Sequence, residues 1–195
     1  MSEGQPDISA DRLFFLDEQQ VVVEDFDSSG FVLALGGGGE GIIGRLKGSR
    51  VVAIDTDRGE LEEAPEGPLK IVMDARDLKF LDGSFEVVTS FFTLMYLEKS
   101  DHRQIFEEAW RVLVPGGRFL IWGASVPARP DDGKDVLVVP VTVRLPAAEV
   151  ETGYGVVWPE EPFGLTDYLE LAKRVGFEVV ERREDGQVFY LSLRK

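Results

Sequence analysis

Short apolar runs alternate with helix-like patterns over the first two thirds of the chain. Continuous runs of this kind are typical of strands that are buried on both faces of a sheet. They fall at 31–35, 51–54, 71–73, 85–92 and 119–122. Between them, apolar residues at helical spacing predict helices at 42–46, 60–64 and 100–113. Because strands that alternate with helices form right-handed crossover units, the pattern predicts a mostly parallel sheet covered by helices.

The last third of the chain breaks this rhythm. Residues 136–143 and 150–158 alternate partly between apolar and polar positions, which predicts an antiparallel pair of strands. Thr166 is placed to cap a helix that carries apolar residues at helical spacing. Asp185-Gly186 then separates two further strand-like runs, and this dipeptide is a strong signal for a hairpin.

These elements fit a single domain over residues 1–195, since about 100 to 200 residues per domain is usual. The expected parts are an N-terminal segment (1–30), a core (31–123), an insertion (124–164), and a last helix with its hairpin (165–195). The predicted fold class is α/β, with a doubly wound, mostly parallel sheet that ends in an antiparallel C-terminal hairpin.

The composition narrows the chemistry that such a domain can carry. The chain has no cysteine and one histidine, which excludes disulfides, thiolate metal sites and multi-histidine metal sites. Its formal charge of −15 repels phosphate backbones, so we expect no nucleic-acid partner. No run reaches the roughly 20 apolar residues of a membrane span, and the acidic start is unlike a secretory signal. We expect a cytoplasmic protein that is not bound to a membrane.

A glycine-rich loop follows the first predicted core strand. Gly36, Gly38 and Gly41 have the spacing G-x-G-x-x-G at the start of a predicted helix. Glycines at these positions let the backbone turn tightly and approach a ligand closely. Asp55 lies 19 residues after Gly36 at the end of the next strand, where a carboxylate can bind both ribose hydroxyls. A nucleoside cofactor is therefore predicted, and both nicotinamide cofactors and S-adenosylmethionine use this geometry.

Five segments, in order, make the sequence resemble the class I S-adenosylmethionine-dependent methyltransferases. They are Val32–Gly41, Val52–Asp55, Met73–Ala75, Leu78–Val88 and Arg111–Gly117. The resemblance implies a Rossmann-like fold and S-adenosylmethionine as the cofactor. It also implies a set of cofactor-binding residues. These are the loop residues Gly36, Gly37, Gly38 and Gly41, then Asp55 and Thr56 at the ribose, Asp74 and Ala75 at the adenine, and Ser90 and Phe91 after the fourth strand. Glu40 on the same loop is a further cofactor-binding candidate.

Two departures from the family pattern concern the amino-acid end of the cofactor. Ala34 stands where the family commonly has an acidic residue, and Glu40 stands where it has glycine. Glu40 lies on the same loop and can supply the missing charge to the cofactor's ammonium group. The alternative is that Glu40 is an exposed acid that only favours the start of the helix. The same departures keep open a non-catalytic protein that binds S-adenosylmethionine or serves in interactions.

The wall that faces the methyl acceptor is expected after the fourth strand. Ligands of open α/β sheets lie beyond the carboxyl ends of the strands, which places residues 90–96 beside the cofactor. Phe91, Phe92, Met95 and Tyr96 make this wall apolar and aromatic, as suits a small or medium organic acceptor. Tyr96 and His102 are candidate catalytic groups, with an exposed histidine at a helix start as the alternative for His102.

Two further alternatives concern the insertion and the reaction. The strands at 136–143 and 150–158 form either a lid over the acceptor, with Tyr154 and Trp158, or an apolar edge ribbon buried in a homodimer. A nicotinamide-dependent oxidoreductase is the second enzyme hypothesis. No tyrosine–lysine pair with the spacing Tyr-x-x-x-Lys supports it.

Overall fold

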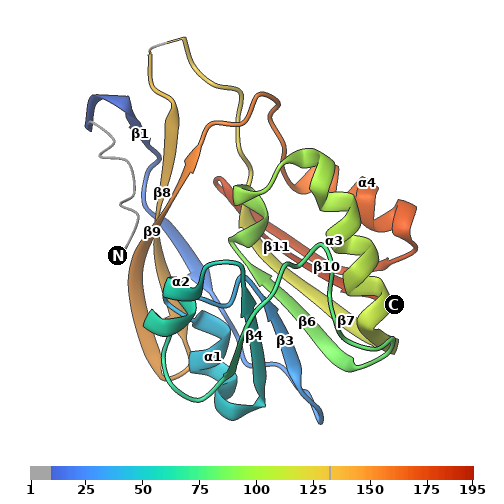
Figure 1. The fold of residues 1–195 in the computed structure, drawn as a ribbon. Helices are drawn as coiled ribbons and strands as arrows, with labels where there is room; N and C mark the ends of the chain where they lie inside the picture. Colours follow the sequence, from blue (N-terminus) through green and yellow to red (C-terminus); the bar gives the residue numbers. More distant parts are fainter. Residues whose placement is uncertain (1–9, 132) are drawn as a thin grey trace.

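The computed structural model describes residues 10–131 and 133–195, so the first nine residues of the predicted N-terminal segment lie outside the described residues. A seven-stranded sheet forms the centre of the fold (Figure 1). Its strands are β3 (Val32–Leu35), β4 (Val51–Asp55), β5 (Leu69–Val72), β6 (Phe85–Phe91), β7 (Leu113–Ala124), β10 (Glu178–Asp185) and β11 (Val188–Arg194).

The strand order is β10-β11-β7-β6-β3-β4-β5. Strands β3 to β7 are parallel, while β11 is antiparallel to both β7 and β10. This is the predicted doubly wound, Rossmann-like sheet with its antiparallel C-terminal hairpin. From β3, the next two strands along the chain, β4 and β5, lie on one side of it in the sheet. The later strands, β6, β7, β11 and β10, lie on its other side. The point where the order reverses therefore lies between β3 and β6, where such sheets bind ligands.

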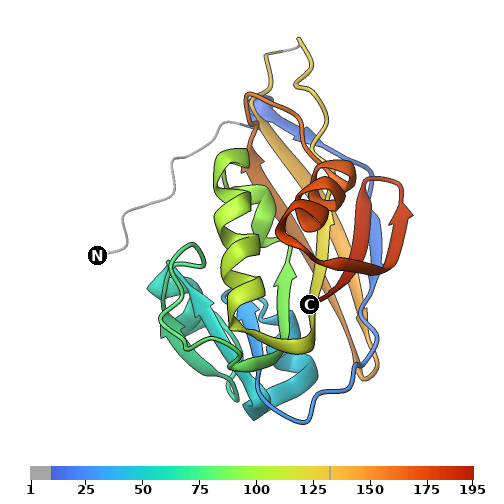
Figure 2. The ribbon, with the colours of Figure 1, turned by 90° about the vertical axis from the view of Figure 1, so that its right-hand side faces the viewer.

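Among the described residues, four α-helices and two short 3₁₀ turns lie between strands, and a third 3₁₀ turn precedes the first strand. They are α1 (Ile42–Lys47), α2 (Arg58–Glu63), α3 (Lys99–Val112), α4 (Leu165–Val175), η1 (Ala10–Arg12), η2 (Gly48–Arg50) and η3 (Thr93–Tyr96). Helices α3 and α4 lie side by side and pack against each other (Figure 2). Helix α3 buries Ile105, Phe106 and Ala109 at the spacing that predicted it.

The starts of α4 and β7 differ from the prediction. Helix α4 begins at Leu165, not after Thr166, and the Asp167 carboxylate accepts a hydrogen bond from the Gly164 N–H at its start. Strand β7 begins at Leu113, because this buried residue pairs with Phe85 before the bulge that brings Arg118 opposite Val87.

A second, smaller sheet stands beside the large one (Figure 1). It contains β1 (Leu13–Phe15), β2 (Gln19–Val22), β8 (Val136–Leu145) and β9 (Ala148–Val157). Strands β8 and β9 form the predicted antiparallel pair. Strands β1 and β2 follow each other along the opposite edge of β8 and are parallel to it.

The expectation that 136–143 lies at a sheet edge is wrong, because β8 is paired on both sides within this chain and β9 is the edge strand. The N-terminal segment supplies the pairing partner. Burial of this ribbon in a homodimer stays a prediction. In the part of the chain that is described, no helix has the length and apolar character needed to cross a membrane.

Candidate functional site

A cavity of about 1130 Å³ lies at the carboxyl ends of the parallel strands, where the strand order reverses. It is larger than the ~300 to 1,000 Å³ common for small-molecule sites. One side of its lining comes from the large sheet and the loops that follow its strands, including residues 34–44, Asp55, Thr56, Met73, Asp74, Ala75, Phe91, Tyr96 and Leu97. The other side comes from the second sheet and includes Leu13, Val136, Val138, Gly153, Tyr154, Gly155 and Val157.

The glycine loop runs along the floor of this cavity without space for side chains. Gly36 has a φ of +61°, and a Cβ there would point directly into the side chain of Thr93. At Gly38 a Cβ would lie 2.6 Å from the Cβ of Glu60 and 3.0 Å from a carboxylate oxygen of Asp55. Both contacts are closer than packed atoms tolerate, so the loop's course depends on glycine at these positions.

The Asp55 carboxylate lies next to this loop, as predicted. One oxygen, Oδ2, lies 3.4 Å from the backbone nitrogen of Gly38, and Oδ1 accepts a 3.0 Å hydrogen bond from the Asp57 N–H. The parallel pairing of β3 with β4 causes this proximity, because Leu35 is opposite Ile54 just before the two strands end. Thr56, the next residue, also lines the cavity.

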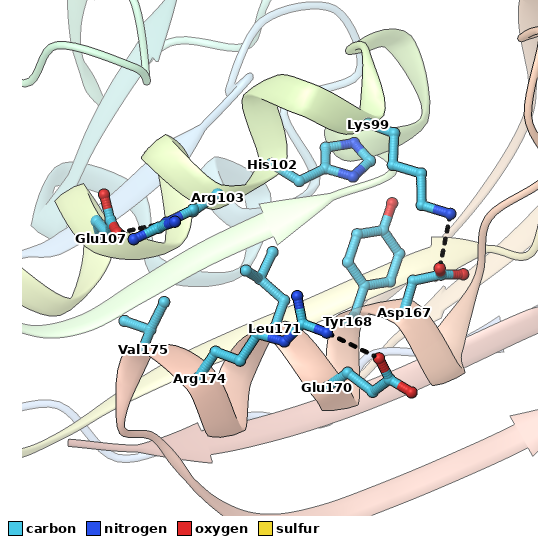
Figure 3. Close-up of a pocket in the computed structure, with 10 residues that line it drawn as sticks. All are labelled: Lys99, His102, Arg103, Glu107, Asp167, Tyr168, Glu170, Leu171, Arg174 and Val175. Atoms are coloured by element: carbon cyan, nitrogen blue, oxygen red, sulfur yellow. Dashed lines mark hydrogen bonds and ion pairs between the residues drawn. The ribbon is translucent and has the colours of Figure 1, made fainter.

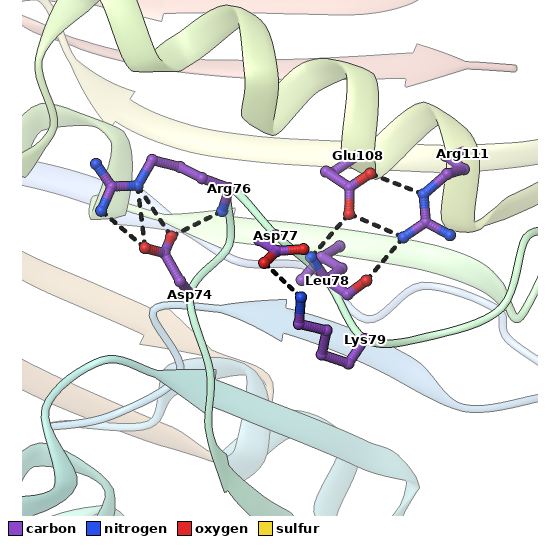
Figure 4. Close-up of polar contacts among 7 residues, drawn as sticks. All are labelled: Asp74, Arg76, Asp77, Leu78, Lys79, Glu108 and Arg111. Atoms are coloured by element: carbon purple, nitrogen blue, oxygen red, sulfur yellow. Dashed lines mark hydrogen bonds and ion pairs between the residues drawn. The ribbon is translucent and has the colours of Figure 1, made fainter.

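The Asp74 carboxylate lines the cavity and is held by an arginine that the sequence interpretation did not single out (Figure 4). Arg76 Nη2 lies 2.7 Å from Asp74 Oδ2, and Arg76 Nη1 lies 2.7 Å from Asp101 Oδ2 on α3. The hydrogen bond from Arg76 lowers the pKa of Asp74 below its usual range. The arginine two residues after Asp74 was the available signal, but the partner on α3 depends on the tertiary fold.

The Glu40 carboxylate connects the glycine loop to β9. Its Oε1 accepts a hydrogen bond from the Thr152 hydroxyl, and its Oε2 lies 3.5 Å from the Tyr154 hydroxyl oxygen. The alternative of an acid that acts only at the helix start is therefore wrong, since Glu40 has partners on another element. Thr152 and Tyr154 were not predicted as its partners, because they are 112 and 114 residues away along the chain.

Several carboxylates lie close together around the glycine loop. Burial raises the pKa of Glu60 above its ordinary value, and the neighbouring carboxylates of Asp55, Asp57, Glu63 and Glu40 add to the rise. The contribution of these neighbouring carboxylates shows that the potential around Glu60 is negative. The cavity therefore favours a positively charged ligand over an anionic one.

Among the residues predicted after β6, the structure brings Phe91 and Tyr96 to the cavity but not Ser90. Ser90 is fully buried, and its hydroxyl has no hydrogen-bond partner among the described residues. Phe92 is buried with a φ of +55° and stacks on Tyr154, with ring centres 4.6 Å apart. The aromatic wall thus includes a tyrosine from the second sheet.

Tyr96 combines an exposed ring with a hydroxyl in a desolvated, negative setting. The side chain is half exposed, and its hydroxyl lies next to the backbone of Gly155. Burial of the phenol and the nearby carboxylates of Glu40 and Glu60 raise the pKa of Tyr96 to about 12. The phenol is consequently protonated at neutral pH.

His102 does not line this cavity. It lies in a separate cavity of about 590 Å³ between α3 and α4 (Figure 3). Its Nε2 lies 2.9 Å from the Leu94 carbonyl oxygen, and its ring packs against Phe163 and Tyr168. The alternative of an exposed histidine is wrong, because only 2% of this residue is accessible. Helix α4, which covers it, comes from a distant part of the sequence.

Three comparisons with known proteins agree with this geometry. Residues 33–121 match the family described as a methyltransferase domain. The chain is 33% identical over 168 residues to a demethylmenaquinone methyltransferase of Clavibacter sepedonicus, covering 77% of this chain and 66% of that protein. The chain thus spans just under two thirds of the length of this relative.

Solved structures share the fold. A Pyrococcus horikoshii protein superposes with a TM-score of 0.63 at 23% identity, covering 86% of this chain and 82% of that one. An S-adenosylmethionine-dependent methyltransferase of Mesorhizobium loti gives a TM-score of 0.61 at 17% identity, covering 87% of this chain and 94% of that one.

The doubly wound sheet, with a glycine loop and an acid at its reversal point, defines a nucleoside-binding α/β protein. Residues 33–121 match a methyltransferase domain and the fold is shared with an S-adenosylmethionine-dependent methyltransferase, so the chain is similar to the class I S-adenosylmethionine-dependent methyltransferases. The cofactor of this family is S-adenosylmethionine. The residues of the cavity fit it, because Asp55, Asp74 and the glycine loop line one cavity and carboxylates surround the loop.

Proposed function

We propose that this chain transfers the methyl group of S-adenosylmethionine to a small or medium organic acceptor. The observation that carries the proposal is the division of the cavity. Carboxylates surround the glycine loop, whereas the side chains from β6, η3 and the second sheet are mainly apolar and aromatic, and Glu40 lies where the two parts meet. A cationic cofactor suits the first part, and an uncharged organic molecule suits the second.

The cofactor is expected to lie with its ribose at Asp55 and its adenine near Asp74 and Ala75, all of which line the cavity. Gly36, Gly37, Gly38 and Gly41 shape the loop that it follows, and Thr56 borders the ribose. Glu40 takes the ammonium group in place of the acid that is missing at Ala34. The same carboxylates oppose the pyrophosphate of a nicotinamide cofactor, which favours methyl transfer over the oxidoreductase alternative.

The reaction we propose is an in-line displacement. An electron pair of the acceptor forms the bond to the methyl carbon as the carbon–sulfur bond breaks, and S-adenosylhomocysteine leaves as a neutral thioether. The positive charge passes to the methylated acceptor atom, which loses its proton to solvent. Alignment of the two reactants and exclusion of water supply most of the acceleration. Tyr96 is suited to orient the acceptor rather than to take its proton at neutral pH, because its pKa is about 12. The name of the Clavibacter relative gives a quinone acceptor, which supports an organic ring as substrate.

Thermal-shift and calorimetric titrations with S-adenosylmethionine, S-adenosylhomocysteine and NAD test the cofactor. A ligand at 100 times its dissociation constant stabilises the folded state by about 2.7 kcal/mol. We expect both adenosyl compounds to bind and NAD not to bind. Asp55→Asn should weaken adenosyl binding, whereas Asp82→Asn, an exposed acid outside the cavity lining, should not.

Turnover separates the enzyme from a non-catalytic binding protein. Formation of S-adenosylhomocysteine is measured with a panel of phenols, quinols, amines and thiols. Production that depends on an acceptor supports the proposed function. Binding of the cofactor without turnover on any member of the panel would favour the non-catalytic alternative.

A further inference from the structure

Two glycines interrupt β9 where it lines the cavity. Gly153 and Gly155 flank Tyr154 in the interior of this strand. Glycine weakens a strand interior, and it commonly marks a bulge, a tight bend, or a place where a ligand approaches closely. The pairing of β8 with β9 runs without a shift from Val136 opposite Val157 to Leu145 opposite Ala148. A bulge therefore does not explain the two glycines.

The backbone does not require glycine at either position. Neither residue is among those with a positive φ. A Cβ added at Gly153 would lie 3.8 Å from its nearest neighbour, and one at Gly155 would lie 3.9 Å away, which are ordinary contact distances. What the two glycines do is leave the surface of β9 flat and open towards the cavity.

The surface around these glycines is apolar. The strand register places Leu13, Val136 and Val157 in one row across the second sheet, and Phe15, Val138 and Gly155 in the next row. Because side chains alternate along strands, these residues share one face with Gly153. We call the seven residues Leu13, Phe15, Val136, Val138, Gly153, Gly155 and Val157 the open face. All of them except Phe15 line the cavity.

The open face runs from buried residues inside the cavity to residues that are exposed to solvent. Val136 is buried, whereas 68% of Val157 and 59% of Phe15 are accessible. The residues between them on the strands, such as Leu137, Val139 and Val156, point the other way and are buried in the core. In the middle of the face, the Gly155 backbone lies next to the Tyr96 hydroxyl, which belongs to the proposed acceptor wall.

We propose that the open face binds a slender hydrocarbon part of the methyl acceptor, which is therefore an amphipathic molecule. The acceptor's reacting group lies beside Tyr96, and its apolar part lies over the two glycines towards Val157 and Phe15. This inference rests on the proposed function. An uncharged apolar part is the occupant that suits this face, since the seven residues carry no charge and the chain as a whole is strongly acidic.

Displacement of the neutral fluorescent probe N-phenyl-1-naphthylamine by 4-ethyl-, 4-butyl- and 4-hexylphenol tests the proposal. For the wild-type protein, affinity is expected to rise about fourfold for each methylene that becomes fully buried. Gly155→Leu fills the open face and should remove most of this dependence on chain length. Gly153→Leu provides a second variant at an independent position. Glu151→Leu, on the same side of β9 but outside the cavity lining, should behave as wild type.

Unfolding curves establish that each variant is folded, and calorimetry with S-adenosylhomocysteine is run in parallel. Retained S-adenosylhomocysteine binding together with a lost chain-length dependence in both glycine variants supports the open face as the acceptor site. The inference is overturned if affinity does not depend on chain length, or if both glycine variants match the wild type. It is also overturned if they turn a dimer into a monomer, because the face would then join two copies. Absence of S-adenosylhomocysteine binding in the wild type instead counts against the proposed function.

Discussion

The carboxylate of Glu40 lies 3.5 Å from the hydroxyl oxygen of Tyr154, which links the glycine loop to the second sheet. Thr152 donates a hydrogen bond to the other oxygen of the same carboxylate. One side chain thus faces both the proposed ammonium position of the cofactor and the strand that forms the opposite wall. Cofactor binding and the position of β9 are consequently expected to depend on the same charge.

Replacement of Glu40 by glutamine should weaken S-adenosylmethionine binding about tenfold, because hydrogen bonds to charged groups contribute about 1.5 to 3 kcal/mol. Glutamine keeps an oxygen that can accept from Thr152, so the variant mainly removes the charge. Isothermal titration calorimetry gives the two dissociation constants. Glu66→Gln, an exposed acid outside the cavity lining, is the control and should bind as wild type. Equal affinities for Glu40→Gln and wild type would exclude the proposed role.

A single methyl group on the glycine loop should be more damaging than its size suggests. In Gly38→Ala the new Cβ meets the Cβ of Glu60 at 2.6 Å and Asp55 Oδ2 at 3.0 Å, so α2 or the carboxylate must move. We expect a loss of about 1 to 3 kcal/mol in the free energy of unfolding, and weaker cofactor binding. Gly30→Ala is the matched control, since its Cβ would lie 3.8 Å from its nearest neighbour. Urea denaturation of both variants measures the difference, and equal stabilities would contradict the prediction.

The sequence was sufficient for those features that depend on neighbouring residues. The buried strand before Gly36 and the acid at the end of the next strand predicted the cofactor loop, because parallel strands bring their carboxyl ends together. The sequence did not predict which segments pair when they are far apart along the chain. Leu13 pairs with Val136, and no local pattern indicates that partner. The same holds for Arg76 with Asp101 and for the covering of His102 by α4.

All four tyrosines of the chain should titrate late. The pKa of each is raised, chiefly by burial, and that of Tyr96 reaches about 12. A raised folded-state pKa stabilises the protein below the unfolded value of about 10, and this contribution is lost as the pH rises through the folded value. The free energy of unfolding should therefore fall above pH 10.

Tyr96→Phe should show a smaller fall between pH 10 and 12 than the wild type, because one raised pKa has been removed. Ultraviolet titration of tyrosinate in the folded protein provides an independent measurement. At neutral pH the same variant should bind S-adenosylmethionine as wild type and change the KM for the acceptor more than kcat. If the variant instead lowers kcat without changing KM, and if the fall of kcat at alkaline pH seen in the wild type is absent from the variant, the phenol takes part in proton transfer.

His102 should make the folded protein sensitive to mild acid. Burial lowers the pKa of His102, against the opposing effects of the Leu94 and Leu97 carbonyls and of Asp101 and Asp167. Because the folded-state pKa lies below the unfolded value of about 6.5, the stabilisation is present above that pH and is lost as the pH falls below it. His102→Gln removes this contribution.

The difference in free energy of unfolding between wild type and His102→Gln should therefore be larger at pH 7.5 than at pH 5, as measured in urea. The variant should bind S-adenosylmethionine normally, since His102 lines the separate cavity between α3 and α4. Parallel stability curves for the two proteins over this range would show that the histidine titrates normally and is not held neutral by burial.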